Sequence, residues 1–327
     1  MAAPTHDSLE EIASLEKRLT GSAGLKSLSE IRRLFEICED ADLSVIAEAL
    51  QAIRRVLLHH RQLQPEKRNS VAEFLRRHEE AYMATLGQLC RLGSAKAQVC
   101  AIRLVFSAWQ EDSAVAQLEA RHECMEPLVS SLMAARTLHD SALDCLVQEY
   151  AVPFVDVRLY LLSGLKLCLQ KVASFEAAES ATTVPEEPDA KRRRLESPLM
   201  QALKASTSAR EEIFGKALTL LQKLPEPSQE QHADKPGNSE SLWDVDQGAR
   251  LSVFLVDSRS KPLSFFAKSV RRSFQDTWLR LLGLQVPLSR YKPLLQMLPS
   301  RVMPHLTQPL MLADFYIKAF SSGSSEV

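Results

Sequence analysis

The chain has 327 residues, a formal net charge of −1 and an apolar fraction of 45%. This composition is ordinary for a globular protein, and the balanced charge gives no overall field that would attract nucleic acid or a membrane. Leu and Ala number 50 and 36, against 8 Ile and 20 Val. Because Leu and Ala favour helices whereas β-branched residues favour strands, we predict an all-α fold and exclude an all-β one.

Apolar residues recur at helical spacing through the first 175 residues. One stripe, with steps of three or four residues, consists of Ile46, Leu50, Ile53 and Leu57. Further stripes run through 74–89, 99–109, 128–150 and 157–172. Repeats that start near Ile31, Val71, Ala114 and Val157 would have a period of about 40 residues, typical of HEAT and armadillo proteins. We therefore predict a HEAT/armadillo-like α-solenoid, with an irregular helical bundle as the alternative.

The sequence carries little that indicates secretion or membrane insertion. Residues 1–10 are polar and acidic, unlike a secretory signal. No run of apolar residues approaches the ~18 that are needed to span a membrane, so we expect no membrane-spanning helix in this sequence. The six cysteines are all at least ten residues apart, which excludes a Cys-x-x-Cys zinc pair. We interpret them as buried side chains in a reducing compartment.

Changes in composition divide the chain into four parts. Residues 1–175 form the predicted helical-repeat region, and residues 176–241 a mostly disordered linker with one helix near 208–224. Residues 242–320 are aromatic and contain several prolines. There we expect a helix before Pro287 and shorter helices after Pro293 and Pro309, since proline is tolerated in a first helical turn. Residues 321–327 form a polar tail.

A basic cluster lies inside the predicted linker and consists of Lys191, Arg192, Arg193 and Arg194. Four adjacent cations on an extended segment suit the acidic groove of a nuclear import receptor, so we interpret the cluster as a nuclear-localisation signal. A solubilising charge run and a nucleic-acid patch are the alternatives. The acidic flanks, which include Glu187 and Glu196, oppose binding of a polyanion.

Ser197 and Pro198 follow this cluster directly. Our hypothesis is that Ser197 is phosphorylated by a proline-directed kinase. The added negative charge beside Arg194 would weaken import. An unmodified linker serine is the alternative.

No arrangement of residues typical of an enzyme is found. The eight histidines form no His-Glu-x-x-His pair, and the sequence has neither a phosphate-binding Gly-x-x-x-x-Gly-Lys-Ser/Thr loop nor a Gly-x-Ser-x-Gly elbow. Carboxylate pairs such as Glu79 and Glu80 are expected on solvated helix faces. We therefore predict a protein without catalytic residues, cofactor, metal or small-molecule substrate.

Residues 271–315 carry the most specific pattern. It combines F-Q-x-x-W-L at 274–279, P-L-S-x-Y-K at 287–292, P-x-L-x-Q-P at 304–309 and D-F at 314–315. This combination resembles the CCAAT-binding-factor-like domain of nucleolar complex proteins, and the nucleolar complex protein four family in particular. Segments 148–160 and 214–221 are also similar to that family. Pro299 stands where the family leads us to expect a His. The resemblance stops at Phe320, so we expect a C-terminally shortened chain with a partial domain.

The resemblance implies a HEAT-like solenoid that acts as a non-enzymatic scaffold in the nucleolus. It implies that the protein acts together with nucleolar protein fourteen and other small-subunit processome proteins, in 18S rRNA maturation and 40S subunit biogenesis. Pre-rRNA is a further candidate partner. The alternatives are a nuclear DNA- or RNA-binding protein related to transcription, and a cytoplasmic transport adaptor.

The same region supplies candidate interface residues. They are the aromatic residues Phe274, Trp278, Tyr291 and Phe315 and the basic residues Arg271, Arg272 and Lys292, beside which Arg280 and Arg290 add charge. Aromatic residues are enriched at interface hot spots, and cations contact acidic partners or rRNA phosphates. The alternatives are core packing for the aromatic side chains and solvated helix faces for the cations.

Overall fold

The computed structural model describes residues 4–21, 30–40, 42–63, 70–91, 94–116, 125–180, 197–206, 208–227, 252–255 and 262–323. Every regular element among them is a helix, apart from one isolated parallel β-bridge between Phe154 and Ser252. The predicted all-α fold is therefore confirmed. None of the described helices has the length and apolar character needed to cross a membrane.

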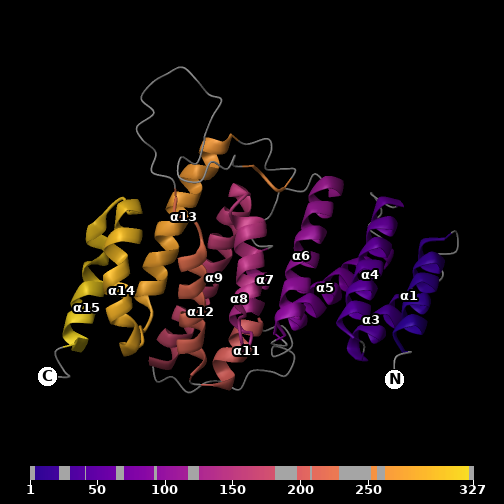
Figure 1. Cartoon of the computed structure of the whole chain (residues 1–327), viewed down its shortest axis with the longest axis horizontal. Helices are drawn as coiled ribbons and strands as arrows, with labels where there is room; N and C mark the ends of the chain where they lie inside the picture. The colour runs from indigo at the N-terminus through magenta and orange to yellow at the C-terminus, as the bar shows by residue number, and fades with distance from the viewer. Residues whose placement is uncertain are drawn as a thin grey trace. The chain divides into compact units, whose positions relative to one another are not determined.

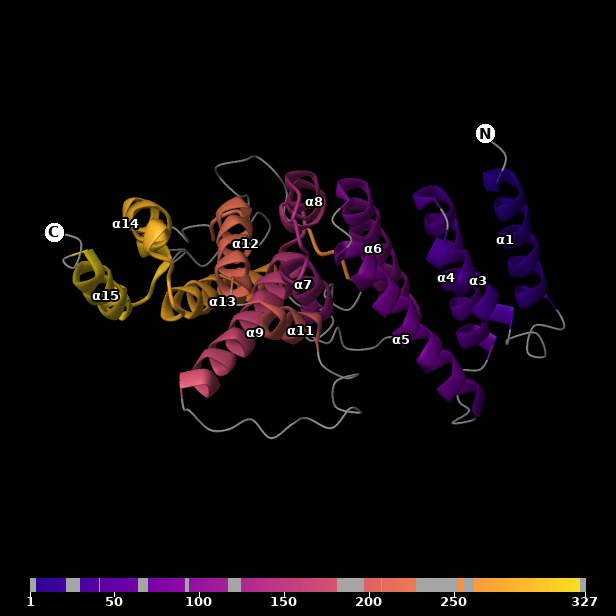
Figure 2. The ribbon, with the colours of Figure 1, turned by 90° about the horizontal axis from the view of Figure 1, so that it is seen from below.

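The chain divides into two compact units, residues 1–115 and 116–327. The helices of the first unit are α1 (Pro4–Thr20), α3 (Ile31–Asp40), α4 (Leu43–Leu63), α5 (Ser70–Arg91) and α6 (Ala95–Ala116, which ends one residue beyond the unit) (Figure 1). Helix α4 packs against α1, α3 and α5, and Figure 2 shows it beside α1 and α3. Its predicted apolar stripe faces this contact, because Leu50, Ile53 and Leu57 are buried.

Polar side chains join the helices of the first unit. Arg55 on α4 pairs with Glu16 on α1 at 2.6 Å, and Arg33 on α3 pairs with Glu11 at 2.8 Å. The buried His60 places Nε2 2.8 Å from the carbonyl oxygen of Leu19, so it donates a hydrogen bond to the end of α1. Burial lowers the pKa of His60, which keeps this imidazole neutral.

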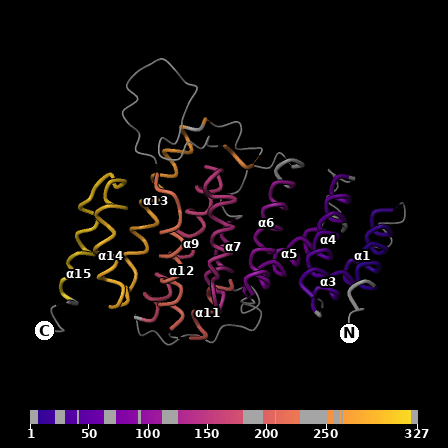
Figure 3. The backbone as a smooth tube through the Cα atoms, in the orientation of Figure 1, coloured from indigo at the N-terminus to yellow at the C-terminus, as the bar shows by residue number. Residues whose placement is uncertain are grey.

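The second unit contains the remaining helices, whose path can be followed in Figure 3. They are α7 (Met125–Met133), α8 (Asp140–Asp144), the π-helix η3 (Cys145–Ala151), α9 (Val155–Ser180), α11 (Pro198–Ala205), α12 (Ala209–Lys223), α13 (Leu263–Gly283), α14 (Leu288–Arg301), the 3₁₀ helices η5 (Met303–His305) and η6 (Pro309–Leu312), and α15 (Ala313–Gly323). The predicted linker thus holds α11 and α12 among its described residues.

Helix α9 is the centre of the second unit, where it packs against α7, α11 and α13. Its stripe through Val157, Leu161 and Leu165 is buried. The hydroxyl of Thr277 on α13 donates a 3.2 Å hydrogen bond to the carbonyl of Leu162, in addition to a local bond within α13. The chain therefore surrounds α9 with helices from both earlier and later parts of the sequence.

Three helix boundaries differ from the predictions. Ala114 does not start a repeat, because α6 runs through it to Ala116. Helix α9 continues to Ser180, beyond the expected end near 175. The helix expected after Pro293 begins at Leu288, and both Pro293 and Pro299 lie inside it. These two prolines lack the N–H groups that would bond the carbonyls of Ser289 and Leu295. Both prolines are exposed, so neither ring takes up space in the core.

Gly164 on α9 allows the close approach of α7. A methyl group at this position would lie 3.2 Å from the backbone nitrogen of Glu126 and 3.2 Å from the carbonyl carbon of Met125. We expect Gly164→Ala to lower the free energy of unfolding by about 1 kcal/mol. The crowding of backbone atoms outweighs the gain in helix propensity of about 1 kcal/mol. Urea denaturation monitored by circular dichroism measures the change.

Gly283→Ala is the matched control, because a methyl group there meets nothing within 4 Å. It should raise stability slightly, by about 0.4–1 kcal/mol. If Gly164→Ala were as stable as Gly283→Ala, the described packing of α7 on α9 would be wrong.

Candidate interaction surfaces

A buried carboxylate joins two distant segments of the second unit. Asp156, at the start of α9, is fully buried and accepts hydrogen bonds from the backbone N–H groups of Phe254 and Leu255, both at 2.9 Å. It also accepts one from Val157 at 3.0 Å. A buried carboxylate requires such donors, and its place in the first turn of α9 is favoured by the helix dipole. We call this contact the Asp156 junction.

Neighbouring side chains complete the Asp156 junction. The ring of Phe254 packs edge-on against Tyr150 and Phe154, with centroid distances of 5.9 and 5.0 Å. Arg158, only 3% exposed, donates from Nε to the carbonyl of Ala151 and from a terminal nitrogen to that of Val152, both at 3.1 Å. Its guanidinium therefore satisfies the carbonyl end of the π-helix.

The candidate aromatic residues lie mainly in the core. Phe274 and Trp278 are 0% exposed and Phe315 is 4% exposed. Tyr291 is half-buried and stacks on Phe315 with a centroid distance of 5.7 Å. Their positions agree with the core-packing alternative and place none of these three buried rings on a surface.

The candidate cations differ in their surroundings. Arg271 donates from Nε to the carbonyl of His305 at 3.5 Å, and the guanidinium of Arg290 lies against Gly215 on α12. Arg272, Arg280 and Lys292 are exposed and form no hydrogen bond or ion pair with another described residue. Among the candidate cations, these three therefore carry charges that no described side chain compensates.

Gln275, in the F-Q-x-x-W-L part of the motif, joins α13 to the segment around Thr307 by hydrogen bonds. Its side-chain oxygen accepts hydrogen bonds from both the backbone N–H and the hydroxyl of Thr307, each at 3.0 Å. Pro287 precedes α14 as its N-cap, and Pro309 is the first residue of η6. The motif thus builds the fold of this region.

An apolar face of α15 was missed by the sequence analysis. Phe315 and Ala319 point inward, whereas Ile317 and Phe320 are 66% and 82% exposed. Leu310, on η6, is 86% exposed. A helix with apolar side chains on both faces is typical of one that is covered on both sides. The spacing of Leu310, Ile317 and Phe320 by seven and three residues was the signal in the sequence.

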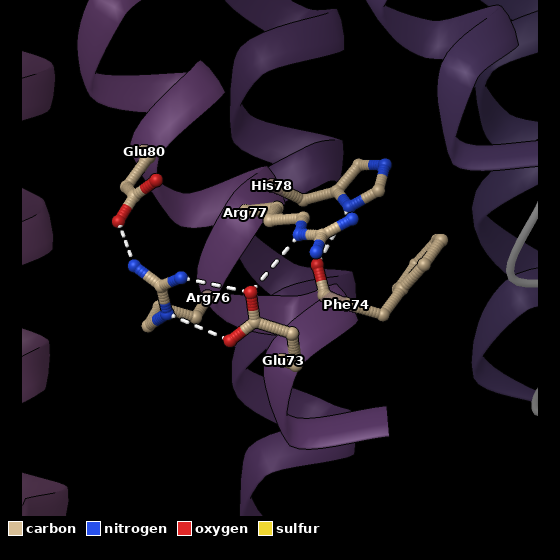
Figure 4. A network of polar contacts seen from close by, with 6 residues as sticks. All are labelled: Glu73, Phe74, Arg76, Arg77, His78 and Glu80. Carbon is tan, nitrogen blue, oxygen red and sulfur yellow. Dashed lines mark hydrogen bonds and ion pairs between the residues drawn. The ribbon is translucent and has the colours of Figure 1, made fainter. Parts of the chain in front are cut away.

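The charges on α5 are paired with one another, as Figure 4 shows. Glu73 accepts hydrogen bonds from Arg76 and Arg77, and Arg76 also bonds Glu80. The hydrogen bonds from Arg76 and Arg77 lower the pKa of Glu73 to about 2. This carboxylate stays ionised at neutral pH, and the group presents little unbalanced charge.

The other predicted sites lie outside the described residues or have buried functional groups. The basic cluster 191–194 lies outside the described residues. Ser197 is the N-cap of α11, in an extended conformation, and its hydroxyl oxygen is buried without a hydrogen-bond partner. Burial raises the pKa of the Cys38 and Cys90 thiols to about 12, which makes both unreactive at neutral pH. No cluster that could hold a metal occurs among the described side chains.

Comparison with known proteins now decides the family. The family described as nucleolar complex protein 4-like, TPR repeats, matches residues 3–174. The chain belongs to the nucleolar complex protein 4-like family. Its helices are thus those of a repeat protein, which confirms the predicted α-solenoid class. No solved structure matches the chain.

Several curated relatives agree with this family. An uncharacterized protein of Schizosaccharomyces pombe is 28% identical over 199 residues, which are 61% of this chain and 31% of that protein. NUCLEOLAR COMPLEX ASSOCIATED 4 of Arabidopsis thaliana is 28% identical over 112 residues, 33% of this chain and 19% of that protein. The nucleolar complex protein 4 homolog of Rattus norvegicus is 38% identical over 58 residues, 18% and 11% of the two chains.

The aligned part of the chain spans about a third or less of the length of these relatives. The family match lies in the N-terminal half, whereas the specific motif lies at 274–315. The family assignment therefore rests on residues 3–174. The names of the relatives confirm the predicted nucleolar location.

Substitution of Asp156 tests the junction. Asp156→Asn replaces one carboxylate oxygen with an amide that cannot accept a hydrogen bond. We expect the free energy of unfolding to fall by about 1–3 kcal/mol, because a buried donor then loses its partner. Hydrogen exchange should become faster at the amides of Phe254 and Leu255. Urea denaturation and hydrogen-exchange mass spectrometry provide the two measurements.

Asp144→Asn is the control, since Asp144 is exposed and pairs with Lys223 at the surface. Its effect should stay within about 1 kcal/mol. Unchanged exchange at residues 254 and 255 in Asp156→Asn would contradict the described role of the carboxylate.

Proposed function

We propose that the chain acts as a non-enzymatic scaffold in nucleolar ribosome biogenesis, specifically in assembly of the small (40S) subunit and processing of 18S rRNA within the small-subunit processome. The observation that carries this proposal is the match of residues 3–174 to the nucleolar complex protein 4-like repeats. Stacked helical repeats provide extended surfaces that bind other macromolecules. Such surfaces suit the assembly of a large particle better than the binding of a small substrate.

The proposed partners are nucleolar protein fourteen, other small-subunit processome proteins and pre-rRNA. We further propose that residues 1–175 supply the helical repeats and that residues 242–320 belong to a CCAAT-binding-factor-like domain. Two features support a role in binding. The exposed apolar side chains of Ile317 and Phe320 and the exposed cations of α13 are both available to other molecules.

Affinity purification tests the proposed partners. A tagged form of the 327-residue chain, expressed in cells, should recover nucleolar protein fourteen and other processome proteins from nuclear extract. Recovery should survive nuclease treatment, because the proposed scaffold is held by protein contacts. Mass spectrometry identifies the bound proteins.

A longer family member, tagged in the same way, is the control. If the longer protein recovers these partners and the 327-residue chain does not, the proposed role fails for this chain. Recovery of chromatin proteins in place of processome proteins would instead favour the alternative related to transcription.

We propose that the cluster Lys191, Arg192, Arg193 and Arg194 directs nuclear import. Replacement of all four residues by Ala should shift a fluorescent fusion of the chain from the nucleus to the cytoplasm, because the import receptor loses its cationic ligands. Fluorescence microscopy measures the nuclear fraction. Arg32, Arg76, Arg77 and Arg103 are exposed cations of the first unit, and their replacement by Ala is the control. Equal nuclear fractions in both variants would exclude the proposed signal.

Phosphorylation of Ser197 is the regulatory part of this proposal. Its hydroxyl is buried at the N-cap of α11, so modification requires this end of the helix to open, and an added phosphate would then lie where a helix dipole favours negative charge. In the same microscopy, Ser197→Asp should reduce import relative to Ser197→Ala. Identical nuclear accumulation of the two variants would contradict the proposed regulation of import by Ser197.

A further inference from the structure

We propose that the exposed face of α13 binds single-stranded RNA. This inference rests on the proposed function, because it makes pre-rRNA a direct ligand of the scaffold. It concerns four side chains, which we call the α13 stripe: Phe265, Lys268, Arg272 and Arg280.

The α13 stripe follows from helix geometry. Its members are separated by three, four and eight residues, and at about 100° per residue they lie within about a third of the circumference of the helix. All four are exposed. The opposite face of α13 carries the buried side chains of Phe266, Val270 and Phe274. The core therefore fixes α13 so that the stripe faces outward.

The charges of the α13 stripe are unbalanced. Lys268, Arg272 and Arg280 form no ion pair or hydrogen bond with another described residue. Asp276 is the one acidic side chain of α13, and Lys166 on α9 binds it at 3.3 Å. That carboxylate lies between Arg272 and Arg280 on the same face of α13, and Lys166, a cation outside the stripe, neutralises it. The arrangement on α5 is the opposite, because there Arg76 and Arg77 are paired with glutamates.

An aromatic ring at one end of these cations favours a polynucleotide as the ligand. Phe265 is 44% exposed and lies one turn before Lys268. Single-stranded nucleic acids are bound by cations that follow the phosphates and by aromatic rings on which bases stack. From Phe265 to Arg280 the helix extends about 22 Å, which is long enough for several nucleotides. The ring of Phe265 contacts Phe266 edge-on with a centroid distance of 5.5 Å. An acidic protein segment would use the cations but has no bases to stack on the exposed part of the ring.

Fluorescence anisotropy with a labelled uridine oligonucleotide of about 12 nucleotides tests the proposal on the full chain. The triple variant Lys268→Gln, Arg272→Gln, Arg280→Gln should bind roughly tenfold more weakly at low salt. Its plot of log K against log salt should be flatter by about 2, because each lost phosphate contact removes about 0.7 from the slope. Circular dichroism checks that the variants remain folded.

The matched control removes three cations of the first unit, through Arg32→Gln, Arg76→Gln and Arg77→Gln. It changes the net charge equally and should leave the affinity within about twofold, since none of these cations belongs to the α13 stripe. Phe265→Ala should weaken oligonucleotide binding about fivefold or more through lost stacking. It should leave binding of inorganic polyphosphate, which has no bases, unchanged.

Equal affinities of the triple variant and its control would overturn the proposal. So would a Phe265→Ala variant that binds the oligonucleotide as the unaltered chain does, or tighter binding of polyglutamate than of the oligonucleotide, which would indicate an acidic protein partner. Purification from cells separates this result from the proposed function. The triple variant should still recover processome proteins after nuclease treatment and should lose its ultraviolet crosslink to pre-rRNA. If the unaltered chain binds RNA but recovers none of those proteins, the proposed function alone fails.

Discussion

The Asp156 carboxylate imposes the strongest single constraint on the second unit. It is buried at the start of α9 and is satisfied by backbone N–H groups 98 and 99 residues later in the chain. A buried ionised group without such donors would cost several kcal/mol, at about the scale of the stability of a whole domain. The segment 252–255 is therefore held at the beginning of α9. Helix α13, which comes later in the chain, is the main packing partner of α9. Its buried side chains Phe266, Val270 and Phe274 fix which of its faces is exposed.

Several residues of the segments that resemble the family have structural roles. Asp156 and Arg158 satisfy backbone groups, Gln275 binds the backbone of Thr307, and Phe274 and Trp278 fill the core. Each role needs a particular side chain at a particular place. These residues therefore build the fold and do not mark a binding site. The sites for other molecules must be sought among exposed residues outside these contacts.

Helical periodicity predicted much of the fold, since the stripes of α4 and α9 are buried where the sequence placed them. It failed at Ala114, which lies in the last turn of α6, because alanine favours the interior of a helix and does not mark where a helix begins. The candidate surface was predicted less well. Spacing can place Arg271 and Arg272 on α13, but only the folded chain shows that Arg271 bonds the carbonyl of His305 and that Arg272 has no described partner.

A net charge of −1 first argued against contact with nucleic acid. The positions of the charges in the fold weaken that argument. At physiological salt the Debye length is about 8 Å, so a phosphate at the surface responds to charges within roughly that distance and hardly to the sum over the whole chain. On α5 the cations and carboxylates cancel within one or two turns. On α13 the single carboxylate is bound by Lys166, so three cations remain uncompensated along one face. A chain that is neutral overall can therefore present a local positive surface, and the pairing of each charge decides where it lies.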